Sequence, residues 1–296
     1  MILERYIRVT TVDECVQALA ELGEKGENAS LLAGGTDLIP KLRQGKLSVS
    51  TVIDLAHVPN LDRIESDENG VFIGSMRRLR ALQKEENLPA PMDVLRQCAG
   101  RVSSMQVRNV ATLGGNVCNA SPAADTVPGL LVLDATARIR DRQGTREVPM
   151  ESFFCAPGKT ILGPEDLLTG FFIPRTPPNT GAAYRKHAIR GDSDVAIVGA
   201  GARITLDADG RISTARIALA SAGPTPLRMK SEEQILAGKY PEAPLLKEAA
   251  AACAERCSPI ADQRASKEYR KEMIRVWIED ALKGALAAAQ QTMYGS

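Results

Sequence analysis

The spacing of apolar residues along the first 56 positions predicts a small α/β lobe. Apolar residues recur at the helical period over 11–22, as on a helix with one buried face. The short apolar runs 30–33 and 51–55 are typical of buried strands, and residues 38–43 between them have a helical pattern. This order of elements indicates a lobe of mixed helix and sheet over about residues 1–56.

The next stretch, about residues 57–176, predicts a second lobe with more strands. Pro89 and Pro91 separate two of its helical patterns. The strand-like runs are 71–74, 136–140, 147–149 and 167–173, and the helix-like runs are 79–86, 93–100 and 126–133. Residues 105–125 form a long passage of glycine and small side chains.

Residues 175–181, with the sequence RTPPNTG, form the clearest linker, and the pattern changes after them. The predicted strands are 182–187, 195–206 and 211–220, with a hairpin turn at 207–210, and helices follow around 232–237, 245–257 and 269–289. Strands followed by helices indicate an α+β domain, here with a three-stranded antiparallel sheet, over residues 181–291.

Charge and composition exclude several classes of partner. Lys and Arg number 37 and Asp and Glu 36, so the net charge of +1 lacks the basic excess of nucleic-acid-binding or polybasic membrane-surface proteins. Aromatic residues are 4% of the chain, too few for a platform that stacks single-stranded bases. No apolar run approaches the roughly 18 residues that suggest a membrane span, and the N-terminus shows no secretory-signal pattern. We therefore expect no membrane span and a cytoplasmic protein.

The cysteines and histidines indicate neither disulfides nor a metal site. Six cysteines lie at 15, 98, 118, 155, 253 and 257 without a C-x-x-C pair, and His57 and His187 are isolated from each other. Cysteines stay reduced in most proteins that are not secreted. We expect reduced, structural cysteines and no metal bound by this chain.

Two glycine-rich turns are the candidate ligand-binding elements. Gly34-Gly35 lies where a predicted strand meets a predicted helix, and Gly114-Gly115 lies in the small-residue passage of the second lobe. Without side chains, both turns allow a phosphate to approach backbone N–H groups. Taken singly, the first could be a plain strand–helix turn and the second an ordinary surface loop. Together, in adjoining lobes, they indicate a diphosphate-containing cofactor held between the lobes.

Four segments carry a resemblance to a known family. They are LLAGGTDLIPKLRQG, QVRNVATLGGNVCNASPAADTVPGLLVLDA, PGKTILGPEDLLTGFFIP and YRKHAIRGDSDVAIVGAGARI. The chain resembles, over essentially its whole length, the FAD-binding medium subunit of the molybdenum hydroxylases, the family of xanthine dehydrogenase, carbon monoxide dehydrogenase and 4-hydroxybenzoyl-CoA reductase. The resemblance implies a two-lobed FAD-binding PCMH domain of the vanillyl-alcohol-oxidase type over 1–176. A CO-dehydrogenase-flavoprotein-type α+β domain over 181–291 would follow it.

The resemblance also implies which residues bind FAD. They are Leu32, Ala33, Gly34, Gly35, Thr36, Asp37, Leu38, Val102, Thr112, Gly114, Gly115, Asn116, Asp125, Leu168 and Lys186. The turn over residues 32–38 would offer backbone N–H groups to the diphosphate. The turn over residues 112–116 would hold the diphosphate and the nearby ribityl chain.

Four of these residues have individual roles in the resemblance. Asp125 would contact the cofactor, and Leu168 would pack in the FAD pocket. Val102 stands where some relatives place an aromatic residue that packs on the cofactor. Lys186 would lie near the flavin, where a cation tunes its redox behaviour. On its own, Lys186 would be interpreted as a solvated strand lysine.

The resemblance implies an electron-transfer role with no catalytic residue in this chain. Substrate would be hydroxylated at the molybdenum cofactor of a large partner subunit. Electrons would pass through [2Fe–2S] clusters of a small partner to FAD here, and then to NAD, oxygen, a quinone or a ferredoxin. The expected assembly is a dimer of heterotrimers. Residues 112–125 are continuous, without the cysteine-rich insertion of the benzoyl-CoA-reductase branch, so we expect no cluster in this chain.

Two other functions stay open. One is a self-sufficient FAD-dependent oxidoreductase of the same FAD fold, which would need its own substrate domain with a proton donor. The pattern after residue 181 does not resemble such a domain. The other is a structural subunit that has lost its flavin, and the two intact glycine turns argue against it.

Overall fold

The first lobe is built on a parallel sheet. The computed structural model describes residues 4–191 and 193–294. The elements of this lobe are β1 (Arg5–Arg8), α1 (Val12–Glu24), β2 (Ala29–Leu32), α2 (Leu38–Arg43) and β3 (Thr51–Asp54). Within residues 4–55 the strand order is β1-β3-β2, so the fully buried β3 lies in the centre. α1 begins at Thr11, whose Oγ1 accepts a hydrogen bond from the N–H of Glu14 at 3.0 Å.

The second lobe combines an antiparallel sheet with short helices. Between residues 56 and 176 the strand order is β4-β5-β10-β6-β7. The strands are β4 (Ile64–Ser66), β5 (Gly70–Gly74), β6 (Thr136–Asp141), β7 (Gly144–Pro149) and β10 (Leu167–Pro174). The helices are α3 (Leu79–Gln83), α4 (Val94–Gly100), α5 (Met105–Arg108), α6 (Leu113–Cys118) and α7 (Thr126–Val132). A 3-10 turn η1 (Met150–Ser152) and a small hairpin of β8 (Phe154–Ala156) and β9 (Lys159–Thr160) complete the lobe.

Part of the glycine-rich passage of the second lobe is helical, which the apolar pattern did not predict. Ser104 caps α5 and Thr112 caps α6, each by accepting a hydrogen bond from a backbone N–H of the first turn. Gly114 and Gly115 lower the intrinsic helix propensity of α6, so its sequence looks like a loop. The cap and the complete burial of Leu113 hold this turn in place.

An antiparallel sheet and its helices follow residue 176. The strands are β11 (Thr180–His187), β12 (Val198–Leu206), β13 (Ile212–Ala220) and β14 (Leu227–Arg228). The helices are α8 (Lys230–Leu236), α9 (Ala243–Arg256) and α10 (Lys267–Tyr294). The prediction of three strands was wrong, because β14 pairs with the edge of β13 and makes the sheet four-stranded among the described residues. Two residues are too few to show an alternating pattern.

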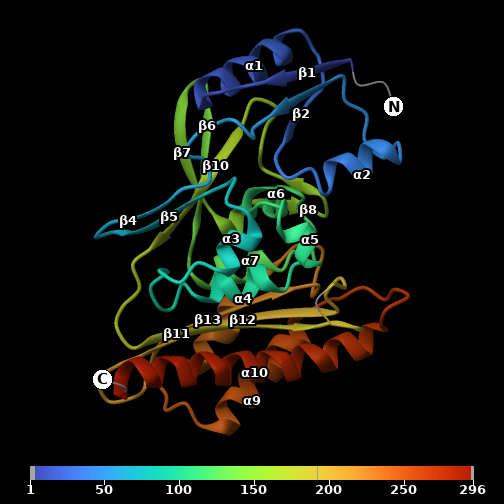
Figure 1. Ribbon diagram of the computed structural model, residues 1–296. Coiled ribbons are helices and arrows are strands. Elements are labelled where there is room, and N and C mark those ends of the chain that lie inside the picture. The colour runs from blue at the N-terminus through green and yellow to red at the C-terminus, as the bar shows by residue number, and fades with distance from the viewer. Residues whose placement is uncertain (1–3, 192, 295–296) are drawn as a thin grey trace.

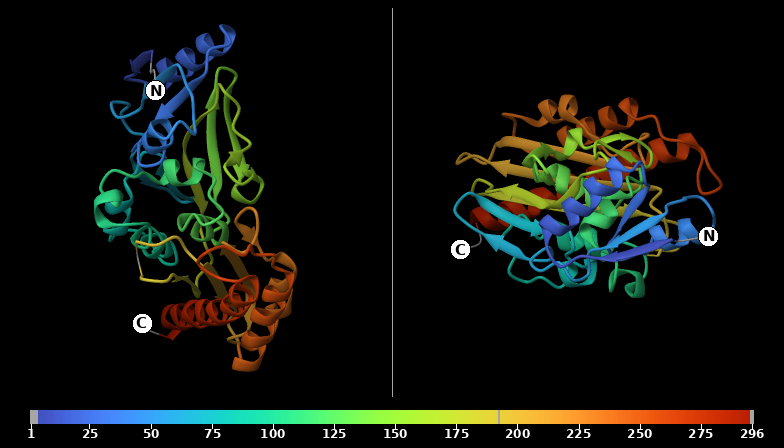
Figure 2. Two further views of the ribbon diagram at one scale, coloured as in Figure 1. Left: turned by 90° about the vertical axis from the view of Figure 1, so that its right-hand side faces the viewer. Right: turned by 90° about the horizontal axis from the view of Figure 1, so that it is seen from above.

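The C-terminal sheet is covered on both faces (Figure 1). α10 lies along one face, and α4 and α7 of the second lobe pack on the other. Gly181 permits close packing of β11 on α10, because a Cβ there would lie 2.2 Å from the backbone nitrogen of Ala289. Figure 2 shows the elongated molecule that results, with the first lobe at one end and α10 at the other.

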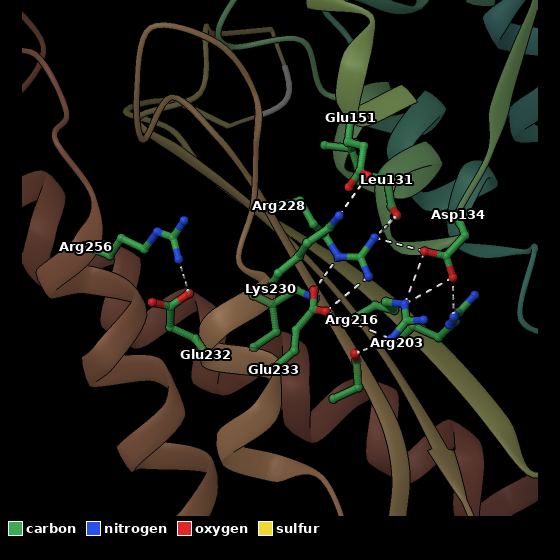
Figure 3. A network of polar contacts seen from close by, with 12 residues as sticks. Leu131, Asp134, Glu151, Arg203, Arg216, Arg228, Lys230, Glu232, Glu233 and Arg256 are labelled. Carbon is green, nitrogen blue, oxygen red and sulfur yellow. Dashed lines mark hydrogen bonds and ion pairs between the residues drawn. The ribbon is translucent and has the colours of Figure 1, made fainter. Parts of the chain in front are cut away.

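A cluster of charged side chains joins the second lobe to the C-terminal sheet (Figure 3). Asp134, just after α7, accepts hydrogen bonds from Arg203, Arg216 and Arg228 at 2.7, 3.1 and 2.9 Å. These arginines come from β12, β13 and β14, and the side chains of Arg203 and Arg228 are buried. One carboxylate therefore ties the lobe to neighbouring strands of the sheet.

The apolar cores follow the same division. Two clusters lie in the first lobe, a third fills the second lobe and reaches the C-terminal sheet, and a fourth lies between that sheet and its helices. All six cysteines are free, and burial raises the pKa of the Cys15 and Cys257 thiols to about 12. Among the helices described, none is long and apolar enough to cross a membrane.

Candidate functional site

Two adjoining cavities lie at the glycine turns between the first and second lobes, beside a third of about 390 Å³ that is lined by Ala33, Gly34 and Thr112. The larger of the two adjoining cavities has a volume of about 450 Å³ and the smaller of about 310 Å³. Ala33, Leu38 and Gly115 line both cavities. These two adjoining cavities are called the interlobe cleft below, and they lie between lobes, where ligand sites are common.

The first glycine turn connects β2 to α2 and touches the second lobe. Gly35 has a φ of +71°, which glycine adopts without strain. A Cβ on Gly34 would lie 2.1 Å from the backbone oxygen of Val110, so only glycine fits between the lobes here. Among the described residues, no acceptor takes a hydrogen bond from the backbone N–H of Gly34, Gly35 or Thr36. These donors are free to bind an anion in the cleft.

The second glycine turn forms the start of α6, and its donors are already used. The N–H of Gly114 donates to the backbone oxygen of Ser75 at 2.8 Å, and the N–H of Gly115 donates to Thr112 Oγ1 at 3.0 Å. A Cβ on Gly114 would lie 2.6 Å from the Cβ of Ser75. The second turn therefore supplies a close, side-chain-free wall, whereas the first turn supplies free donors.

A buried polar group lies at the wall of the larger cavity. Lys186 Nζ contacts Asp125 Oδ2 at 2.8 Å and donates to the backbone oxygen of Arg101 at 2.8 Å. The hydroxyl of Tyr184 donates to Asp125 Oδ1 at 2.7 Å. The Lys186 side chain is only 2% exposed, so it is not a solvated strand lysine.

Burial dominates the acid–base behaviour of this group. Burial raises the pKa of Asp125, and the charge and hydrogen bond of Lys186 oppose this rise. Burial, followed by the charge of Asp125, raises the pKa of Tyr184 well above its ordinary value. The Tyr184 hydroxyl therefore stays protonated and donates a hydrogen bond to the carboxylate of Asp125.

Most of the cofactor residues predicted from the sequence line the interlobe cleft. The larger cavity is lined by Ala33, Gly34, Gly35, Thr36, Asp37, Leu38, Val102, Thr112, Gly115, Asn116 and Asp125. Gly114 and Leu168 line the smaller cavity. Leu32 and Lys186 line neither cavity. Leu32 packs in the apolar cluster of Leu42, and Lys186 reaches the cleft through Asp125.

Sequence reasoning missed several residues at the cleft. Lys41 Nζ donates to Asn119 Oδ1 at 2.5 Å, and Asn119 Nδ2 donates to Asp37 Oδ1 at 3.1 Å, so these side chains join the two lobes. Lys41 lies four residues after Asp37, and this helical spacing could have identified it. Tyr184 lies two residues before Lys186 in β11, a spacing that puts both side chains on one face of the strand.

The interlobe cleft has the chemistry of a site for an elongated, anionic ligand. The free N–H groups of the first turn and the Lys41 ammonium can bind phosphate oxygens. The two adjoining cavities leave room for the ring systems of such a ligand. Within residues 4–191 and 193–294, no group of three or more His, Cys, Asp or Glu side chains is placed to hold a metal ion. The residues present therefore fit FAD, a dinucleotide with a central diphosphate.

Two family models match the chain. The model described as "FAD binding domain in molybdopterin dehydrogenase" matches residues 3–176. The model described as "CO dehydrogenase flavoprotein C-terminal domain" matches residues 169–285. The first match contains both glycine turns and both lobes. The second match contains the C-terminal sheet, α8, α9 and most of α10.

Similar proteins match along nearly the whole chain. The xanthine dehydrogenase FAD-binding subunit of Escherichia coli O157:H7 is 31% identical over 286 residues, which cover 96% of this chain and 96% of that protein. The carbon monoxide dehydrogenase medium chain of Afipia carboxidovorans is 30% identical over 285 residues, which cover 96% of this chain and 97% of that protein.

A solved structure agrees with these sequence matches. A chain of carbon monoxide dehydrogenase from Hydrogenophaga pseudoflava matches with a TM-score of 0.90 and 30% identity, over 97% of this chain and 99% of that chain. The family resemblance and the fold class predicted from the sequence are confirmed, apart from the strand number of the C-terminal sheet. The chain belongs to the FAD-binding medium subunits of the molybdenum hydroxylases, the oxidoreductase family of xanthine dehydrogenase and carbon monoxide dehydrogenase.

Proposed function

We propose that this chain is the electron-transfer subunit of a heteromeric molybdenum hydroxylase. It holds FAD in the interlobe cleft and receives electrons from the [2Fe–2S] clusters of a small partner subunit. It passes them to an external acceptor, which is NAD, oxygen, a quinone or a ferredoxin. When bound, FAD supplies the redox chemistry that ordinary amino-acid side chains lack.

One observation carries the proposal. The larger cavity is lined by Gly34, Gly35 and Thr36, whose backbone N–H groups have no acceptor among the described residues. It adjoins the smaller cavity at Ala33, Leu38 and Gly115. Backbone donors that are unpaired are costly unless water or a ligand accepts their hydrogen bonds. A diphosphate supplies several acceptor oxygens at this one point, and the adjoining cavity gives room for the rest of the ligand.

The side chains of the cleft position the cofactor rather than react with substrate. Lys186 and Tyr184 hold both carboxylate oxygens of Asp125, so this acceptor keeps one orientation at the cavity wall. A cofactor hydroxyl can donate to it there. The Lys186 ammonium offsets the charge of Asp125, so the wall presents a paired carboxylate rather than an unbalanced negative charge.

Other subunits perform the substrate chemistry in this proposal. The relatives are named as a FAD-binding subunit and as a medium chain of dehydrogenases. We infer a large molybdopterin-binding subunit and a small [2Fe–2S] subunit, assembled as a dimer of heterotrimers in the cytoplasm. The domain limits 1–176 and 181–291 and the individual FAD contacts of the predicted residues stay predictions.

Removal of FAD from the purified complex tests this proposal. The FAD-free complex should still oxidise substrate with an artificial dye that takes electrons from the partner subunits, but should lose reduction of the physiological acceptor. Added FAD should restore that activity. Reduction of the physiological acceptor at an unchanged rate without FAD would contradict the electron-transfer role. Substrate turnover by this chain and FAD alone would instead favour the self-sufficient oxidoreductase.

A further inference from the structure

The charges around the larger cavity are unbalanced. The carboxylates of Asp37, Asp125 and Asp194 line it, and Lys41 is the single cation among its described lining residues. Asp125 is paired with Lys186 at 2.8 Å, and Asp194 is paired with Arg190 at 2.5 Å. These two carboxylates therefore have cations of their own, and neither depends on Lys41.

Lys41 carries a charge, but its hydrogen-bond partner among the described residues is neutral. Its Nζ donates to the neutral amide oxygen of Asn119, and within the described part of the chain no carboxylate lies within ion-pair distance. The amide of Asn119 in turn donates to Asp37. Lys41 lies in α2, directly after the first glycine turn, and lines the same cavity as the free N–H groups of that turn.

We propose that Lys41 is the diphosphate-binding cation of the interlobe cleft. This inference rests on the proposed function, because it requires FAD in that cleft. On binding, Nζ exchanges the neutral Asn119 oxygen for a charged phosphoryl oxygen, which is the stronger acceptor. The backbone N–H groups supply hydrogen bonds without net charge, whereas Lys41 neutralises one of the two negative charges of the diphosphate. The amide of Asn119 remains hydrogen-bonded to Asp37.

Titration of the FAD-free full chain with FAD tests the assignment, using Lys41→Gln, Lys41→Arg and Lys46→Gln. Lys46 is a matched control because it is an exposed lysine that follows α2 and does not line the cavity. Lys41→Gln should weaken FAD binding about tenfold at low salt, the size of one charge-assisted hydrogen bond at an exposed position. The difference from wild type should shrink as salt rises, because salt screens the lost attraction. Lys41→Arg should keep most of the affinity, and Lys46→Gln should match wild type.

The outcomes separate this inference from the proposed function. If Lys41→Gln binds FAD like Lys46→Gln at every salt concentration, the assignment of Lys41 is overturned while FAD binding stands. A loss in Lys41→Gln that is independent of salt and not rescued by Lys41→Arg would show a structural role and would also overturn it. If wild type binds no FAD, the proposed function fails and this inference fails with it.

Discussion

Lys186 shows how one side chain can serve both folding and cofactor binding. Its ammonium, buried on β11, holds the carboxylate of Asp125, which directly precedes α7. The pair therefore links the C-terminal sheet to the wall of the interlobe cleft. A buried carboxylate that loses its cation is much more costly than a buried pair.

Lys186→Met should destabilise the protein in a pH-dependent way. Without the ammonium, the pKa of Asp125 in the folded state rises further above its ordinary value. The loss of unfolding free energy should be about 3 kcal/mol at pH values above that raised pKa. It should shrink as the pH falls through that raised pKa and should be smallest below about 4, where the carboxyl is protonated in both the folded and the unfolded chain. Denaturant unfolding at a series of pH values measures this.

Lys159→Met is the matched control for this prediction. Lys159 is an exposed lysine on β9, so its replacement should change the unfolding free energy by less than about 0.5 kcal/mol at every pH. A Lys186→Met variant as stable as this control would show that the ion pair contributes nothing to folding.

The sequence located most of the cleft but could not show how its charges pair. The glycine turns can be recognised from the sequence alone, because their glycines are adjacent. Gly34 and Gly114 are needed because another segment of the chain comes close to each of them. Lys41 and Tyr184 lie at regular spacings from Asp37 and Lys186, but those spacings do not show which groups they bind. Their roles depend on Asn119 and Asp125, which are distant in sequence and meet them only in the folded chain.

At the scale of elements, the contact between the β2–α2 turn and the α5–α6 connection sets the shape of the cleft. Gly34→Ala should separate these elements, because the new Cβ would collide with the backbone oxygen of Val110. If two of the three free N–H donors of this turn are displaced, FAD should bind about 100-fold more weakly. Overpacking should lower the unfolding free energy by about 1–3 kcal/mol. FAD titration and thermal unfolding of the variant check both effects.

Gly26→Ala separates backbone strain from loss of the cleft. Gly26 has a φ of +67°, and a Cβ there would meet no atom within 4 Å. We expect a destabilisation of about 1 kcal/mol and unchanged FAD affinity. If Gly34→Ala binds FAD as tightly as Gly26→Ala does, the turn does not hold the diphosphate.

Elements with a clear apolar pattern were predictable, and elements without one were not. The helix of residues 38–43 and the strands that became β10 to β13 follow clear apolar patterns. β1 was missed because its four residues are mostly exposed, and β14 because it has only two. α6 was missed because its stability comes from a side-chain cap and burial, which outweigh its glycines.

At the scale of the whole molecule, Asp134 ties the second lobe to the C-terminal sheet (Figure 3). Burial alone would raise the pKa of Asp134, but Arg203, Arg228 and Arg216 together outweigh it and lower the pKa. Its contribution to stability is therefore present above the ordinary aspartate pKa of about 4 and is lost as the pH falls through the lowered pKa.

Asp134→Asn should cost about 2 kcal/mol of unfolding free energy at neutral pH, after discounting for the partial exposure of this carboxylate. The difference from wild type should disappear in acid. Asparagine suits this test because it tolerates the φ of +53° found at Asp134. Denaturant unfolding should show no such change for Asp209→Asn, an exposed position in the hairpin turn. Equal stability of the two variants at neutral pH would show that the cluster does not tie the lobe to the sheet.

FAD binding in the interlobe cleft can be tested directly on the purified full chain. Titration of the FAD-free chain, followed by visible absorbance and flavin fluorescence, should end at one FAD per chain. Gly34→Ala should shift that titration to much higher FAD concentrations while the protein stays folded. A wild-type chain that shows no flavin bands after reconstitution, or a Gly34→Ala chain that titrates like wild type, would contradict the account.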